Sequence, residues 1–168
     1  MSFTKFLRDG LWAVILFDFI AGGFTGWIYE TVITSIYLHE FVNRGVLVIP
    51  VLPIYGLFAV FVVPLFRKMR NPFLIGVTGA VLATLFELAG AFLTESLFGY
   101  RLWTYEHWPL NFFGGRISLI SSLVFGALCV LFLKAIHPLG IKLNERYGLK
   151  FQTAVGIISA LLLVCCFL

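Results

Sequence analysis

Five long apolar runs, separated by short polar connections, constrain this chain more than any other feature of its sequence. Each run is long enough to cross about 30 Å of hydrocarbon, and the runs are Leu11–Tyr29, Val46–Phe66, Pro72–Thr94, Ile117–Leu133 and Phe151–Leu168. Only 12% of the residues are charged, whereas a soluble protein carries roughly 25%. We therefore expect an all-α membrane protein with about five transmembrane helices, forming a single polytopic membrane domain over residues 1–168.

The distribution of basic residues predicts an orientation. Nine Lys and Arg residues lie in the N-terminal segment and in the second and fourth connections, and three lie in the others, Arg44, Arg101 and Arg116. The positive-inside rule then predicts a multi-pass protein of the inner membrane with a cytoplasmic N-terminus and an extracytoplasmic C-terminus. The net charge of +4 comes from basic residues in the short connections, where they determine topology, so we expect no nucleic-acid partner.

The second apolar run contains two prolines that break it. Pro50 and Pro53 each lack a backbone N–H and push the preceding residue toward extended conformations. A regular helix can begin only near Pro53, which leaves about 21 Å of helix up to Phe66. Irregular backbone at membrane depth persists only where it is buried in protein or lines a wet cavity. We therefore expect either a cavity or a tightly packed re-entrant corner on the outer side. We also expect the outer loops to be re-entrant or interfacial.

Ionisable groups enter two of the apolar runs. Glu30 shares a helix face with Gly22 and Gly26, because the three residues recur at intervals of four. The two glycines form a GxxxG pair, through which we expect a homo-oligomer to form. Glu87 lies in a stripe of small residues of the third run. Ionisable residues in membrane helices are functional candidates by default, so Glu30 and Glu87 are the candidate catalytic residues. The alternative is that each carboxylate forms a structural pair with an Arg or Tyr.

The candidate ligand-binding residues combine acids, arginines, amides and aromatic side chains around the expected outer corner. Such a mixture can bind a polar or zwitterionic ligand, including a lipid headgroup, by charge-assisted hydrogen bonds. No metal-ligand spacing is present, and we expect no metal and no cofactor. Membrane lipids are expected partners. The candidates are Glu30, Asn43, Arg44, Tyr55, Glu87, Arg101, Trp103, Tyr105, Asn111 and Arg116.

Several short motifs recur in the order found in one family. They are GWIYE at Gly26–Glu30, NRG at Asn43–Gly45 and PIYG at Pro53–Gly56, followed by Glu87, Trp103, Tyr105, Asn111, Gly114 and the stretch Ser121–Gly126. Over roughly residues 20–130 the chain resembles the CmpB-like small integral membrane proteins known as putative ABC-transporter type IV. It departs from the family pattern at three positions, where Ile49, Thr104 and Phe125 replace Gly, Asp and Trp.

Three functions remain open at this point. The resemblance implies a membrane subunit of a transporter for a small molecule or lipid, with a polar site open to the extracytoplasmic side. The 168 residues contain no G-x-x-x-x-G-K-[ST] motif, so a separate ATPase or another transporter subunit is an expected partner. The second hypothesis is a membrane-embedded enzyme acting on a lipid or a lipid-linked phosphate at the outer leaflet. The third is a structural or regulatory membrane protein without a ligand.

Overall fold

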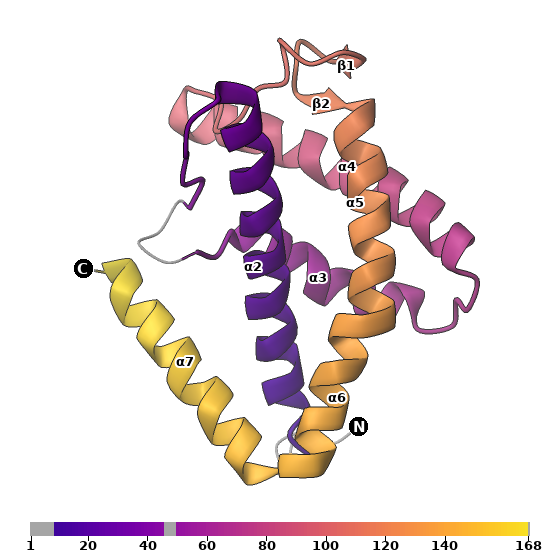
Figure 1. Cartoon of the computed structure of the whole chain (residues 1–168), viewed down its shortest axis with the longest axis vertical. Helices are drawn as coiled ribbons and strands as arrows, with labels where there is room; N and C mark the ends of the chain where they lie inside the picture. The colour runs from indigo at the N-terminus through magenta and orange to yellow at the C-terminus, as the bar shows by residue number, and fades with distance from the viewer. Residues whose placement is uncertain (1–8, 46–49, 168) are drawn as a thin grey trace. The chain divides into compact units, whose positions relative to one another are not determined.

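The computed structural model describes residues 9–45 and 50–167, which fall into two compact units (Figure 1). Unit 1 holds the described residues up to Pro64 and those from Phe132 onward, and unit 2 is Leu65–Leu131. The described residues are mainly helical, as expected, and the one sheet among them is a two-stranded hairpin.

Unit 1 is organised around a long helix, α2 (Leu11–Leu38), whose small residues receive the shorter helix α3 (Pro53–Phe66). A Cβ atom on Gly22 would lie 2.5 Å from Cβ of Ala59 in α3, and one on Gly26 would overlap the ring of Tyr55. The glycines are therefore required for this close approach. They contact α3 of the same chain, so the GxxxG face is not left open for the homo-oligomer expected from Gly22 and Gly26.

The irregular segment before α3 also lies against α2. The backbone N–H of Leu52 donates to the carbonyl of Gly23 at 3.0 Å, and Val51 and Leu52 are buried. Non-helical backbone is thus packed against protein, as its position in an apolar run requires. The α3 helix begins at Pro53 and ends at Phe66, as predicted. Residues 46–49 of the expected re-entrant corner lie outside the described residues.

The remaining helices of unit 1 are a π-helical segment, η1 (Phe132–Ile136), and the helices α6 (His137–Tyr147) and α7 (Leu149–Phe167). The turn at Gly148 joins α6 to α7 in a helical hairpin (Figure 1). The amide of Asn144 donates to the carbonyl of Asp9 at 2.9 Å and accepts from Gln152 at 3.2 Å. These bonds hold the start of α2 to both arms of the hairpin.

Unit 2 consists of two crossing helices and the loop between them (Figure 1). The first, α4 (Pro72–Phe98), starts with the side chain of Asn71 accepting from the N–H groups of Phe73 and Leu74. It meets α5 (Leu119–Leu131) through small residues, because a Cβ on Gly126 would lie 2.5 Å from the carbonyl oxygen of Gly76. The loop contains the hairpin of β1 (Asn111–Phe112) and β2 (Ile117–Ser118), with Asn111 opposite Ser118.

Three helical runs among the described residues are long and apolar enough to cross a membrane: Leu11–Leu38, Pro72–Phe98 and Leu119–Tyr147. The other two expected spans correspond to the shorter apolar helices Pro53–Phe66 and Leu149–Cys165. The long runs continue past the predicted ends at Tyr29, Thr94 and Leu133. In particular, the expected fourth connection is largely helical, since α5, η1 and α6 follow one another without a break.

Candidate functional site

The sequence-predicted residues form two sets, one in each unit. In unit 1, the hydroxyl of Tyr55 donates to Oε1 of Glu30 at 2.6 Å. The Nε atom of Arg44 lies 3.9 Å from the other carboxylate oxygen, Oε2. That separation is an ion pair but too long for a hydrogen bond. Glu30 therefore has one oxygen held by a short hydrogen bond and the other near a guanidinium group.

Local backbone structure brings these three residues together. Tyr55 lies in the first turn of α3, and the absence of a side chain at Gly26 lets its ring lie against α2 one turn before Glu30. Arg44 belongs to the irregular segment after α2, and its backbone N–H lies 3.4 Å from the hydroxyl oxygen of Thr31. The broken second apolar run is thus what places an arginine and a phenol beside a carboxylate of a membrane helix.

Asn43 has a supporting position beside this set. Its Oδ1 accepts from the indole N–H of Trp27 at 2.7 Å and from the backbone N–H of Gly45 at 2.9 Å. These two bonds fix the turn that carries Arg44. Nε of Arg44 is buried and has no hydrogen-bond acceptor among the described residues. The guanidinium group therefore has donor capacity that its protein neighbours do not use.

In unit 2, the predicted residues Glu87 and Tyr105 are in contact. The Tyr105 hydroxyl donates to Oε1 of Glu87 at 2.7 Å, and both residues are buried. The backbone N–H of Tyr105 donates to the carbonyl of Gly115 at 2.7 Å, and its ring meets that of Trp108 edge-on at 5.3 Å. The pair joins a buried carboxylate of α4 to the loop that follows.

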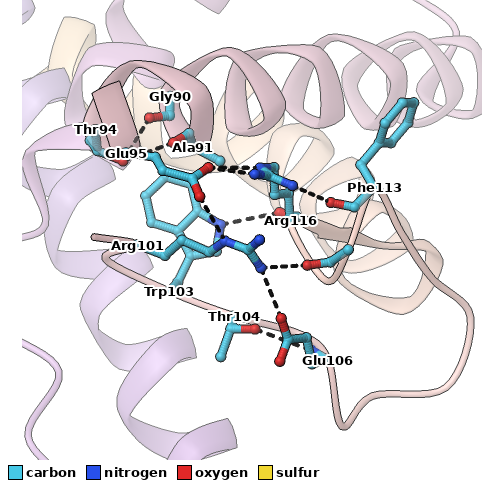
Figure 2. Close-up of polar contacts among 11 residues, drawn as sticks. Gly90, Ala91, Thr94, Glu95, Arg101, Trp103, Thr104, Glu106, Phe113 and Arg116 are labelled. Atoms are coloured by element: carbon cyan, nitrogen blue, oxygen red, sulfur yellow. Dashed lines mark hydrogen bonds and ion pairs between the residues drawn. The ribbon is translucent and has the colours of Figure 1, made fainter. Parts of the chain in front are cut away.

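Arg101 and Arg116 converge on a carboxylate that sequence reasoning missed, Glu95 (Figure 2). Arg116 donates from Nε at 3.1 Å and from Nη2 to Oε2 of Glu95. Arg101 approaches Oε1 with its Nε at 3.4 Å, and its Nη1 donates to Glu106 at 2.9 Å. The Arg116 guanidinium also lies 4.7 Å from the ring centre of Phe92. Four alternating charges therefore tie the loop to the end of α4.

The other predicted residues of this loop serve its backbone. The indole N–H of Trp103 donates to the carbonyl of Arg116 at 3.2 Å, and the amide of Asn111 donates to the carbonyls of Glu106 and Trp108. The hydroxyl of Thr104 accepts from the N–H of Glu106 at 3.3 Å. The carboxylate in this part of the loop is that of Glu106, which binds Arg101.

Glu95 could have been identified from its spacing. It lies two turns after Glu87 and one turn after Ala91, so the three residues share a helix face. The predicted third span ended at Thr94, one residue before Glu95. The helix in fact continues to Phe98.

Most of the chain is similar to a known protein family. The model of the family described as "Putative ABC-transporter type IV" matches residues 17–168. The match covers most of the chain and extends beyond the region on which the sequence resemblance rested. No curated protein and no solved structure matches the chain.

Proposed function

Because the chain belongs to the family described as putative ABC-transporter type IV, we propose that it is the membrane subunit of a transporter for a small molecule or lipid. The site we propose is the unit 1 set of Glu30, Arg44 and Tyr55, open to the extracytoplasmic side. The observation that carries this proposal is the contact of these three groups where irregular backbone packs on a membrane helix.

The chemistry of the set suggests the class of ligand. Arg44 is 35% exposed in its side chain and shares only a long ion pair with Glu30. A guanidinium group with unused donors binds phosphate or carboxylate groups by charge-assisted hydrogen bonds. We therefore propose a ligand with an anionic group held by Arg44 and a hydroxyl or amine held by Glu30.

The broken second run supports transport as the activity. Transporters commonly build their sites from discontinuous spans, because unwound backbone and charged side chains can then meet inside the membrane. Here α3 begins only at Pro53, and the segment before it carries Arg44. In this proposal a separate ATPase subunit supplies the energy, because the 168 residues contain no phosphate-binding G-x-x-x-x-G-K-[ST] motif.

Two measurements test the proposal. The first is affinity purification of the full chain from its own membranes, followed by identification of co-purifying ATPases. The second compares the compounds inside and outside cells that lack the chain with those of cells carrying the wild type, Arg44→Gln or Arg67→Gln. Arg67 is an exposed arginine of unit 2, so its variant controls for the loss of a positive charge.

We expect an ATPase to co-purify, and at least one anionic compound to change its distribution when the chain is absent. The wild type and Arg67→Gln should restore that distribution, whereas Arg44→Gln should not. The transporter proposal fails if no compound is redistributed. If Arg44→Gln restores transport as well as Arg67→Gln does, the site is wrong.

The enzyme hypothesis uses the same three groups. Glu30 would act as a general base toward a lipid phosphate bound by Arg44, 3.9 Å away. A change in the chemical composition of membrane lipids in Glu30→Gln cells, without any redistribution of a compound, would favour it over transport.

For unit 2 we propose a structural role, which corresponds to the third sequence hypothesis. Arg101 and Arg116 each bond to carboxylates and to backbone carbonyls of the loop, at Gly114 and Phe113 respectively. A phosphate would have to displace Glu95 to bind Nε and Nη2 of Arg116. The network is therefore better suited to fixing the loop than to binding a ligand.

A further inference from the structure

A second polar pair, with a buried carboxylate, lies in unit 1, apart from the site proposed above. Nδ1 of His137, the first residue of α6, lies 2.8 Å from Oδ2 of Asp18 in α2. Asp18 is 3% exposed, and its other oxygen, Oδ1, has no hydrogen-bond partner among the described residues. The pair is separated from Glu30 by twelve residues of α2, or about 18 Å.

The local sequence explains why His137 faces Asp18 of α2. Pro138 follows it, and a proline has no N–H to give to the carbonyl four residues earlier. The helix adapts by widening into the π-helical segment η1 immediately before His137. Gly140, one turn into α6, lets that helix approach α2, since a Cβ there would lie 2.5 Å from Cδ1 of Phe17. Such π-helical segments occur frequently at functional sites.

The other charged groups near the pair lie on α2, η1, α6 and α7. Glu30 of α2 and Tyr55 of α3 bond to each other. The remaining charged side chains of the elements packed against the pair are exposed, namely Asp9 before α2, Lys134 of η1, Lys142, Glu145 and Arg146 of α6, and Lys150 of α7. The ionisable group in direct contact with Asp18 is His137.

We propose that Asp18 and His137 form a proton-binding site in the membrane part of unit 1. An ionised Asp18 can only accept, so Nδ1 of His137 carries the hydrogen of their bond and Nε2 is the free basic atom. With that single proton the pair has a net charge of −1. A second proton, taken from water at Nε2, gives an imidazolium–carboxylate pair with no net charge, and its release to water restores the first state.

The two states differ in how well they hold α6 on α2. A net charge in a low-dielectric interior is costly unless it is neutralised, so the protonated pair favours the packed arrangement. Proton release leaves a negative charge and an unbonded Oδ1, which favours separation of the helices or entry of water. The site thus links proton binding to the α2–α6 contact. This inference does not depend on the transporter proposal.

The proton on His137 can be observed directly. The chain has three histidines, and His39 and His107 are exposed, so a variant with both replaced by Gln leaves His137 as the only imidazole. The full-length variant, labelled with ¹³C and ¹⁵N in histidine and placed in lipid nanodiscs, is titrated by NMR between about pH 5 and about pH 9. The same titration is run on Asp18→Asn and on the control Glu145→Gln, which removes an exposed carboxylate from α6.

We expect reversible titration of the His137 signals. Asp18→Asn should lower the proton affinity at least tenfold, because the carboxylate that stabilises the imidazolium is gone, and Glu145→Gln should change it less than twofold. A His137 signal that is constant over the whole pH range would overturn the proposal. Equal midpoints in Asp18→Asn and in its parent would also overturn it. Should Asp18→Asn not fold, the titration of the parent remains decisive.

A second readout separates proton binding from simple packing. Resistance to unfolding by sodium dodecyl sulfate is measured at low and high pH for the wild type and for His137→Gln. The wild type should lose resistance as the pH rises, because the proton that neutralises the pair is released. His137→Gln should have the same resistance at both pH values. An equal pH dependence in the two proteins would contradict the proposed link.

Discussion

Replacing Gly26 with Ala tests the contact on which the unit 1 site depends. The new Cβ would lie 2.5 Å from Cδ2 and 2.6 Å from Cβ of Tyr55. It would also overlap Cγ of Tyr55. Real Cβ atoms do not approach so closely, and Cγ and Cδ2 belong to a rigid ring. Either α3 moves away from α2, or the Tyr55 ring turns and its hydroxyl leaves Glu30.

The expected cost follows from three terms. Overpacking of a tight contact costs about 1–3 kcal/mol, and loss of the hydrogen bond to the Glu30 carboxylate costs about 1.5–3 kcal/mol. Alanine is favoured over glycine inside a helix by about 0.5–1 kcal/mol, which offsets part of the loss. The free energy of unfolding should therefore fall by roughly 2–5 kcal/mol.

Gly156→Ala in α7 provides the matched control. Its new Cβ would lie 3.7 Å from the ring of Trp12, which is an ordinary contact, so only the gain in helix propensity remains. Both variants are unfolded in mixed micelles with increasing sodium dodecyl sulfate, and the helix content is followed by circular dichroism. Gly156→Ala should be as stable as the wild type or slightly more stable.

A double-mutant cycle with Tyr55→Phe identifies the origin of the loss. If Gly26→Ala already breaks the bond between Tyr55 and Glu30, then Tyr55→Phe should cost less in the Gly26→Ala background than in the wild type. The reasoning is refuted if Gly26→Ala is as stable as Gly156→Ala. Full additivity in the cycle would show that α3 moves as a whole and keeps the hydrogen bond.

Two predictions concern unit 2. Gly126→Ala should lower the free energy of unfolding by about 1–3 kcal/mol, because its Cβ would lie 2.5 Å from the Gly76 carbonyl oxygen. Gly76→Ala should be tolerated, because the nearest atom to its Cβ is 3.5 Å away. Unfolding of both variants in dodecyl sulfate measures the difference, and equal stabilities would contradict the packing. Arg116→Lys keeps the charge but loses the two-nitrogen contact with Glu95 and the hydrogen bond to the carbonyl of Phe113. Because these contacts hold the loop between α4 and α5, proteases should cut that loop severalfold faster in the variant. An unchanged cleavage rate would argue against the structural role.

Backbone chemistry made some helix ends predictable. Pro53 and Pro72 were expected to begin helices, and both do, since the N–H that proline lacks has no partner in a first turn. The C-terminal ends were placed too early, at the last apolar residues. Helices end where the backbone changes direction, and α4 stops before Gly99 in a left-handed conformation with φ 75°. Loss of hydrophobicity is a weaker stop signal than a glycine.

Contacts of the candidate site were predictable where the residues involved lie close together in the sequence. The three residues of the unit 1 site lie close together in the sequence. Glu30 is near the end of α2, Arg44 is in the segment that follows, and Tyr55 is in the first turn of α3, and the structure brings them into contact. The contact between Asp18 and His137 spans 119 residues. No spacing rule relates residues so far apart, because their meeting depends on how α6 packs on α2.

The charge network at the end of α4 also has an electrical consequence. Two glutamates and two arginines, Glu95, Glu106, Arg101 and Arg116, are bonded to one another, so the folded loop carries no net charge from these four groups. Moving one elementary charge through a potential of 100 mV changes its electrostatic free energy by about 2.3 kcal/mol. A group of charges with no net charge undergoes almost no such change. The membrane voltage therefore exerts little net force on this loop, on whichever side of the bilayer it lies. Removing a single member of the network would make the loop sensitive to the voltage.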